Sequence, residues 1–375
     1  MRPQLRVSTT ILLCVVTITL RPRVICLPPN LLPLFMSARK LAMHAAPVSI
    51  KFVAERAGVS VATVSRVLND HNAVREETRI QVQCVIDELG YQTNHLARNL
   101  RTARSGLVLV TVPDLRNPFY GRVVEGIAER LQPLGYHTLL CDTRQRTKQV
   151  TNHLQLILQR KVEGAICLDP YTVHRSLAED LHALPWVACC EYDEDTQVPH
   201  VGIDNVAAAR DAVRYLLDRG HRRIAMIGFD QGFLFARQRR AGYEAALEDA
   251  GVALDPHLFR VAPGLGFEDG AETMRSLCQI RERPTAVFAV SDTLAIGAMR
   301  AARDAGLQVP RDLAVVGFDD IDFAAQTDPA LTTIAQPMEA LGRAAAAILV
   351  QRLTHPDVPP INQTLPHELR VRASA

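Results

Sequence analysis

The stretch IKFVAERAGVSVATVSRVLN, residues 50–69, decides how the N-terminal region of the chain folds. Its pattern predicts two short helices joined by a tight turn at Gly58 and Val59. Ser60 stands where an N-cap belongs, because its hydroxyl can accept a hydrogen bond from a free N–H group of the second helix. A compact two-helix unit is therefore expected. The apolar residues spaced to pack its helices together are Ala54, Ala57, Val59, Val64 and Val67.

The second predicted helix turns a small, partly polar face outward, made by Val61, Ala62, Thr63, Ser65 and Arg66. Such a face fits the major groove of DNA, where Arg66 can reach guanine bidentately and Ala62 or Val61 can contact a thymine methyl group. An ordinary helical hairpin inside a globular core has similar apolar spacing and is the alternative on these residues alone. The pattern favours a helix–turn–helix that binds DNA.

Length and charge support a chain of several parts. With 375 residues, of which 48% are hydrophobic, the chain suits two or three folded domains. Residues 1–105 hold 14 Lys and Arg against 6 Asp and Glu, whereas residues 106–375 hold 28 against 34. A basic N-terminal part on an acidic remainder fits a unit that meets phosphates. Residues 49–105 alone hold only 8 against 6, so charge supports this interpretation without deciding it.

The eight cysteines are scattered and show neither a CxxC motif nor a cluster with histidine at metal-ligand spacing. No metal and no cofactor are expected. Adjacent Cys189 and Cys190 would point to opposite faces of a strand, so a disulfide between them is not expected. Buried free thiols fit a reducing cytoplasm.

Residues 1–48 do not fit the rest of the chain. The apolar run ILLCVVTITL, residues 11–20, follows two arginines and is typical of a signal-peptide core, but it is too short to span a bilayer. Export would separate a DNA-binding unit from DNA. The sequence therefore favours a translation start at Met36 or Met43, with a leader upstream that does not fold. A genuine but disordered extension is the other explanation, and both stay open.

A third helix is predicted over Glu76–Leu89, with Ile80, Cys84, Val85 and Leu89 on one face and Gly90 as its C-cap. The stretch NHLARNLR, residues 94–101, is competent to form a short helix and leads into a linker. It has few apolar anchors, so we expect it to be helical only when a partner holds it.

From Leu107 onward, apolar runs alternate with amphipathic helices, which predicts parallel sheets covered on both faces. About ten strands are too many for one sheet, so we expect two doubly wound lobes, with ligands bound beyond the strand ends. Strands are predicted over 107–112, 138–141, 164–168, 186–190, 224–229, 286–290 and 313–318. Among the helices expected between them are 121–132, 205–219, 239–250 and 293–305.

Residues 49–375 resemble the lactose and galactose repressor (LacI/GalR) family of bacterial transcription regulators, and the body looks most similar to the ribose and purine repressors. The motifs that carry the resemblance include VAERAGVSVATVSRVLN, ELGYQTNHLARNL, NPFY at 117–120, RRAGYEAAL at 239–247, SDTLAIGAM at 291–299, VVGFDD at 315–320 and TTIAQP at 332–337. The resemblance implies an α/β fold: a helix–turn–helix head and hinge helix, then two doubly wound lobes of periplasmic-binding-protein type.

The domains expected from this pattern follow the chain in order. They are a leader or mis-called start over 1–48, a DNA-binding domain over 49–93, a hinge and linker over 94–105, and a ligand-binding and dimerisation body over 106–375. Within the body we expect one lobe at about 106–202 plus 293–322, and the other at about 203–292 plus 333–375.

For the head, the resemblance implies that Val61, Ala62 and Arg66 reach base edges while Thr63 and Ser65 lie near phosphates. Ser60, Arg75, Asn94, Ala97 and Leu100 complete the implied DNA contacts, with Leu100 wedged into the central base step from the minor groove. Three residues depart from the family pattern. Phe52 stands in place of an aspartate, Arg75 in place of a small capping residue, and Thr93 in place of a proline before the hinge.

For the body, the resemblance implies a ligand site in which Arg239 and Asp319 offer bidentate hydrogen bonds and aromatic rings stack on the ligand. A sugar or similar polyol suits such a site, and a nucleobase fits the same stacking, so a purine stays an alternative. Asn117 and Asp169 are open candidates, and Asp292 is expected to cap the helix that follows it. The implied ligand residues are Phe119, Tyr120, Tyr192, Arg239, Phe267, Ser291, Asp319 and Gln336.

Together these patterns predict a cytoplasmic, nucleoid-associated regulator, a repressor, that binds a pseudopalindromic operator as a homodimer under the control of a small polar effector such as a sugar. A sugar-binding protein without DNA function, exported or cytoplasmic, is the alternative, but it would not account for residues 49–100. No GxSxG, HExxH or phosphate-cradling glycine loop occurs, so no enzymatic activity is expected.

Overall fold

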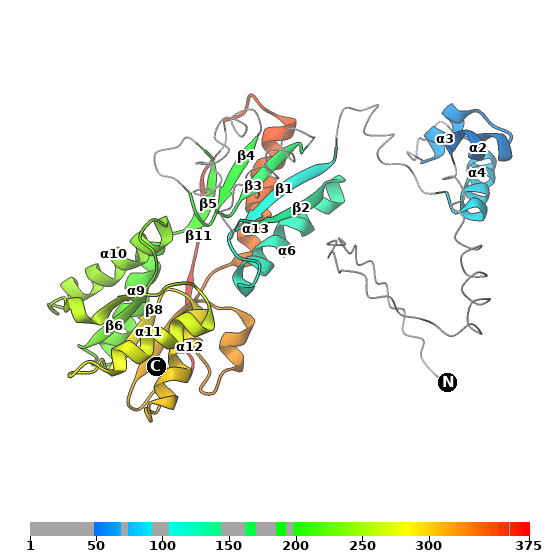
Figure 1. The fold of residues 1–375 in the computed structure, drawn as a ribbon. Helices are drawn as coiled ribbons and strands as arrows, with labels where there is room; N and C mark the ends of the chain where they lie inside the picture. Colours follow the sequence, from blue (N-terminus) through cyan, green and yellow to red (C-terminus); the bar gives the residue numbers. More distant parts are fainter. Residues whose placement is uncertain are drawn as a thin grey trace, which may run out of the picture. The chain divides into compact units, whose positions relative to one another are not determined.

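The computed structural model describes residues 49–68, 74–91, 105–143, 162–169, 185–192, 198–359 and 361–375. The chain divides into two compact units, residues 1–95 and 96–375, which we call the head and the body (Figure 1). The predicted leader and nearly all of the predicted hinge lie outside the described residues.

The described part of the head contains α2 (Ile50–Arg56), α3 (Val61–Leu68) and α4 (Glu76–Leu89). The N–H of Phe52 donates to Ser49 Oγ at 3.2 Å, and the N–H of Thr63 donates to Ser60 Oγ at 3.1 Å. These side chains satisfy backbone groups that the helices leave unpaired, so the predicted capping role of Ser60 is confirmed. Gly90 ends α4 with a φ of 59°, the left-handed conformation that glycine adopts without strain.

The apolar face predicted for the third helix of the head is wrong. In α4 the side chains of Val82, Val85 and Ile86 are buried, whereas Ile80 is 56% exposed and Cys84 is exposed. The buried residues follow the spacing that brings side chains three and four apart onto one helix face. They close a small core with α2 and α3. Its buried members are Val53, Ala54, Ala57, Val64, Val67, Val82, Val85 and Ile86.

The first lobe of the body is built on a sheet in which all pairs of described strands run parallel. The strand order is β11-β5-β4-β3-β1-β2. Helices α6 (Pro118–Leu131) and α13 (Met338–Thr354) pack against each other and belong to this lobe. The strands are β1 (Leu107–Val112), β2 (His137–Asp142), β3 (Gly164–Cys167), β4 (Trp186–Cys189), β5 (His200–Ile203) and β11 (Gln363–Leu365).

The second lobe has strand order β12-β10-β9-β8-β6-β7, and only β12 runs antiparallel among its described strands. Its helices are α9 (Asn205–Asp218), α10 (Leu234–Asp249), α11 (Phe267–Cys278) and α12 (Asp292–Asp304). Its strands are β6 (Ile224–Gly228), β7 (Phe259–Val261), β8 (Ala286–Ala289), β9 (Ala314–Asp319), β10 (Thr332–Ala335) and β12 (Glu368–Arg370). The prediction of two doubly wound lobes is confirmed.

The division of the chain between the lobes differs from the expected one. Strand β9 and helix α12, expected in the first lobe, belong to the second. Helix α13, expected in the second lobe, lies beside α6 in the first, where its orange ribbon stands among cyan and green elements (Figure 1). The close approach of the two helices requires glycine, because a Cβ at Gly342 would lie 2.0 Å from the carbonyl oxygen of Val123.

Between its described elements the chain passes from one lobe to the other at three places, from β5 to α9, from β10 to α13 and from β11 to β12. In both sheets the carboxyl ends of the parallel strands face the cleft between the lobes, as the pocket residues below demonstrate. None of the described helices is both long enough and apolar enough to cross a membrane.

Candidate functional site

The outer face of α3 is the candidate DNA-binding surface of the head. Ser60, Val61, Ala62 and Arg66 are exposed, with Val61 at 38%, while Thr63 and Ser65 are half-buried. Their opposite neighbours on the helix, Val64 and Val67, lie in the core of the head. The helix is therefore held by its apolar side and presents to solvent the residues predicted to contact DNA.

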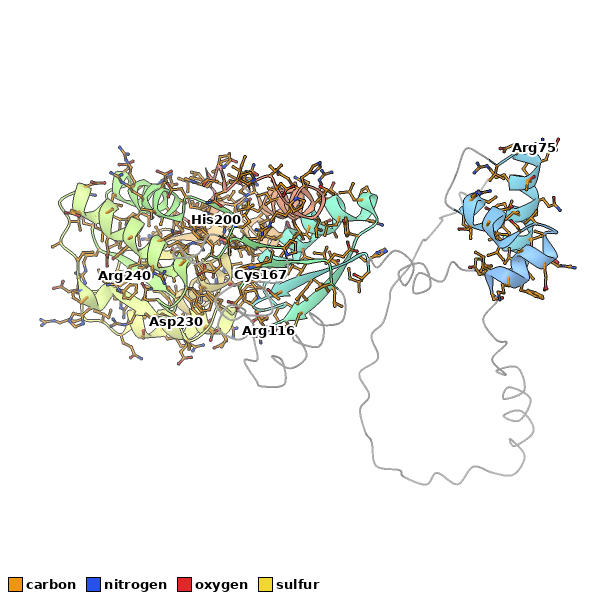
Figure 2. The ribbon with its side chains drawn as sticks, turned by 90° about the horizontal axis from the view of Figure 1, so that it is seen from above. Arg75, Arg116, Cys167, His200, Asp230 and Arg240 are labelled. Carbon is orange, nitrogen blue, oxygen red and sulfur yellow. The ribbon has the colours of Figure 1, made fainter. Side chains whose placement is uncertain are left out.

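Arg66 and Arg75 are among the cations on the head that are available to an anionic partner. Both are exposed, and neither forms an ion pair with the described residues. Figure 2 labels Arg75 on the head. Arg56 and Arg79, in contrast, pair with Glu88 at 3.0 Å and with Glu76 at 3.6 Å. Arg75 precedes α4 without a capping hydrogen bond, in agreement with its departure from the family pattern. Phe52, the other departure within the described residues, is 49% exposed.

Three predicted DNA contacts, Asn94, Ala97 and Leu100, lie outside the described residues, as does Thr93. Their roles stay predictions.

A pocket between the lobes is the candidate effector site. It encloses about 500 Å³, counting its opening to solvent, and residues from both lobes form its wall. From the first lobe these are Pro113, Asn117, Phe119, Tyr120, Leu168, Cys190 and Glu191; from the second they are Phe233, Phe235, Arg239, Leu265, Val290, Ser291, Asp319 and Gln336. Most of them follow a strand closely, which is where ligands bind in folds of this kind.

Of the predicted ligand residues, six line the pocket and two do not. The six are Phe119, Tyr120, Arg239, Ser291, Asp319 and Gln336. Tyr192 instead stacks on His200, with ring centroids 3.8 Å apart, and Phe267 packs edge-on against the exposed Phe323 at 6.3 Å. Both rings therefore pack against residues outside the pocket wall. Of the open candidates, Asn117 lines the pocket and caps α6, whereas Asp169 is buried beside it and accepts from Thr143 at 3.2 Å.

Arg239 is the cation of the pocket and is only 6% exposed. Its Nε donates to Asn205 Oδ1 at 2.9 Å, one Nη donates to the carbonyl oxygen of Val290, and the same Nη lies 3.7 Å from Asp319 Oδ1. The guanidinium carbon sits 3.5 Å from the centroid of the Phe318 ring. Burial lowers the pKa of Arg239, and the neighbouring Asp319 opposes that shift. The side chain is held rigidly by groups of its own lobe.

Asp319 and Ser291 combine a pocket position with a structural contact. Asp319 Oδ1 accepts from Gln336 Nε2 at 2.7 Å, and burial raises the pKa of Asp319 to about 7. Ser291 caps α12 by accepting from the N–H of Leu294 at 3.3 Å. The expectation that Asp292 caps this helix is therefore wrong. Asp292 is fully buried and instead accepts from Thr333 Oγ1 and from the N–H of Ile321.

Glu191 and Cys190 are pocket residues that the sequence analysis missed. Glu191 is 6% exposed, and burial raises its pKa to about 7 although two backbone N–H groups of α10 donate to it. Cys190 adopts a φ of 69°, which brings its sulfur to 3.6 Å from that of Cys189. The two thiols are free, but the expectation that they point to opposite faces is wrong because Cys190 lies beyond the strand end. Position directly after a strand was the signal available for both residues.

Comparison with known proteins places both units in one family. Residues 49–94 match the family "Bacterial regulatory proteins, lacI family", and residues 213–375 match "Periplasmic binding protein-like domain". The chain is 36% identical over 330 residues to the HTH-type transcriptional repressor CytR of Escherichia coli K12, covering 87% of this chain and 96% of that protein. It is 34% identical over 332 residues to the ribose operon repressor of the same strain, covering 87% and 99%.

Solved structures agree with this assignment. The lac repressor dimer bound to operator and the anti-inducer ONPF superposes with a TM-score of 0.78 at 29% identity, covering 88% of this chain and 99% of that one. The transcriptional regulator CelR in complex with cellobiose gives a TM-score of 0.66 at 32% identity, covering 87% and 99%. Similarity over both the head and the body leaves one conclusion. The chain belongs to the lacI family of bacterial transcription regulators, with a helix–turn–helix head for DNA and a periplasmic-binding-protein-like body.

Proposed function

We propose that this protein is a homodimeric repressor that works in the cytoplasm, binds a pseudopalindromic operator through α3, and changes its affinity for DNA when a small neutral polyol or sugar occupies the pocket between its lobes. The observation that carries the proposal is the occurrence in one chain of an exposed α3 face and a pocket walled by both lobes. A ligand held by both lobes favours their closed arrangement and so shifts the conformational equilibrium of the body.

Operator recognition is supported by the chemistry of the α3 face. Arg66 is exposed and suits a bidentate contact with guanine, while Val61 and Ala62 are small and apolar enough to meet a thymine methyl group. Arg75 adds a cation suited to a phosphate. Dimeric operator binding is supported by the lac repressor dimer, which shares the fold of this chain.

A neutral effector is supported by the charges of the pocket wall. Arg239 already engages Asn205, the carbonyl oxygen of Val290 and Asp319, and two buried carboxyl groups, Glu191 and Asp319, face the same cavity. A phosphate or carboxylate on the effector would meet these acids without a free cation to balance them. A polyol can instead donate hydroxyl protons to the carboxylates and rest its C–H faces on aromatic rings.

A nucleoside is the second candidate, favoured by the four aromatic residues of the wall, Phe119, Tyr120, Phe233 and Phe235. Among relatives, an Enterococcus faecium regulator has been solved with bound ribose and CelR with cellobiose, so both saccharides belong in a test set.

The effector proposal is tested by thermal-shift screening of the full chain against ribose, cellobiose, free purines, nucleosides and ribose 5-phosphate. We expect stabilisation by a neutral compound and none by the phosphate, and the Asp319→Asn variant should lose the response. Stabilisation by the phosphorylated sugar alone would overturn the neutral-effector proposal.

The DNA proposal is tested with the region upstream of the protein's own gene, by fluorescence anisotropy for specific binding and by DNase footprinting, in which a symmetric footprint is expected. Binding to a single asymmetric half-site, or no specific binding at all, would overturn the dimeric operator model.

A further inference from the structure

Glu191 connects the two lobes through the backbone of a helix. It follows β4 of the first lobe, yet its carboxyl group accepts hydrogen bonds from α10 of the second lobe. The N–H of Leu234 donates to Oε1, and the N–H of Phe235 donates to Oε2 at 3.1 Å. One side chain thus occupies the first two free N–H groups of a helix that belongs to the other lobe.

Helix α10 has no cap of its own. Its N-cap residue, Phe233, makes no side-chain capping hydrogen bond, and its first turn contains no acidic residue. The free N–H groups and the positive end of the helix dipole are therefore satisfied from across the cleft. Other helices of the body, such as α9 and α12, are capped by residues directly before them, Asp204 and Ser291.

The charges around Glu191 also direct it toward the second lobe. Asp169 of its own lobe repels the carboxylate, whereas Arg239 on α10 attracts it. Among the residues that line the pocket, Glu191 is the one acidic or basic side chain that the first lobe contributes. Opening the cleft would leave Glu191 beside Asp169 and remove both N–H donors and the cation.

We propose that Glu191 is a positioning residue, a latch that holds the two lobes together by capping α10 across the cleft. Because α10 carries Arg239 and Phe235, the latch also sets their position against Tyr120 and Asn117 of the first lobe. It thereby places both walls of the pocket at the separation at which one ligand can contact them together. The functional role of the latch rests on the proposed effector control, but the contact between Glu191 and α10 forms without effector or DNA.

A second contact between the lobes provides a matched control. Arg122 of α6 lies 3.6 Å from Asp322, which follows β9 in the second lobe, and their side chains are 42% and 76% exposed. Arg122 also pairs with Glu339 of its own lobe at 3.1 Å. An exposed pair of this kind contributes little because solvent screens it. Removing Asp322 deletes an acidic cross-lobe partner without touching α10.

The test compares the full-length protein with its Glu191→Ala, Glu191→Gln and Asp322→Asn variants, without effector. Hydrogen exchange is measured on a peptide that covers the first turn of α10 and on peptides from β8 and β9 of the same lobe. Small-angle scattering of the same samples reports the separation of the lobes.

We expect the Glu191→Ala variant to exchange the first turn of α10 about tenfold faster and to show a larger radius of gyration, with β8 and β9 unchanged. The glutamine variant keeps one acceptor oxygen and should fall between alanine and wild type, and Asp322→Asn should match wild type. Unchanged exchange at α10 in the alanine variant would overturn the proposal. So would an equal loss of protection in β8 and β9, because that indicates general destabilisation. Either failure leaves the operator-binding and effector-screening results intact.

Discussion

The stability of the body should depend on pH through Glu191, and the size of the effect follows from its burial. Burial raises the pKa of this carboxyl group from 4.5 to about 7. The folded protein therefore binds the proton more tightly than the unfolded chain does. The stability that this group contributes is fully present below its unfolded pKa and is lost as the pH rises through its folded pKa.

Between pH 5 and pH 8 the loss from Glu191 amounts to about 2.5 kcal/mol, at about 1.4 kcal/mol for each unit of difference in pKa. Asp319, whose pKa burial also raises to about 7, adds a loss of the same sign. The Glu191→Gln variant keeps the Asp319 contribution, so the difference between the two proteins isolates Glu191. Glu129→Gln, which removes an exposed acid of the same lobe (63% exposed), is the control and should follow wild type.

The assay is urea unfolding of the full chain at several pH values, followed by the fluorescence of Trp186. This residue is the single tryptophan of the chain and lies buried at the start of β4, the strand that Glu191 follows. Wild type should lose about 2 to 3 kcal/mol more than Glu191→Gln between pH 5 and pH 8. Parallel pH profiles for the two proteins would refute the reasoning, because they would show that Glu191 is not desolvated on folding.

Three further changes have defined outcomes. Arg66→Ala should weaken operator binding roughly 10- to 100-fold in an anisotropy titration, since a bidentate contact with guanine is worth about 1–3 kcal/mol, and an unchanged affinity would remove Arg66 from the interface. Gly342→Ala should destabilise the first lobe by about 1–3 kcal/mol or more, because its Cβ would lie 2.0 Å from a backbone oxygen of α6, while Gly121→Ala, with open space around its Cβ, should leave the urea midpoint unchanged or raised. Raising the salt concentration from 50 to 200 mM should weaken DNA binding by orders of magnitude, and a flat salt response would contradict a phosphate-dominated interface.

Local patterns made the elements predictable. Ser60 marks the start of α3 because its hydroxyl accepts a hydrogen bond from the backbone N–H three residues later. Each predicted strand range also overlaps an observed strand. Where two apolar stripes compete on one helix, local pattern does not decide between them. In α4 the stripe with Ile80 and the stripe with Val82 share Val85 and Leu89, and packing against α2 and α3 selected the second.

Non-local features were not predictable in the same way. The division into lobes depends on which sheet each late element joins, and α13 joins the first lobe through glycine contacts with α6 that sequence order does not reveal. Glu191 was missed because its role depends on the start of α10, which tertiary structure brings to it. Tyr192, its neighbour, was predicted instead, although its ring stacks on His200 outside the pocket wall.

The pairing of α6 with α13 has a consequence for the order in which the chain acquires structure during synthesis. Glu129 and Arg343 form an ion pair at 2.8 Å although they are 214 positions apart. The first lobe begins near Leu107, but its covering helix and the strand β11 emerge from the ribosome only after every strand of the second lobe except β12. Throughout that interval the nascent first lobe lacks the cover that α13 gives to β3, β4 and β5, and the edge of β5 that pairs with β11 has no partner strand, which is the kind of exposed edge that favours aggregation.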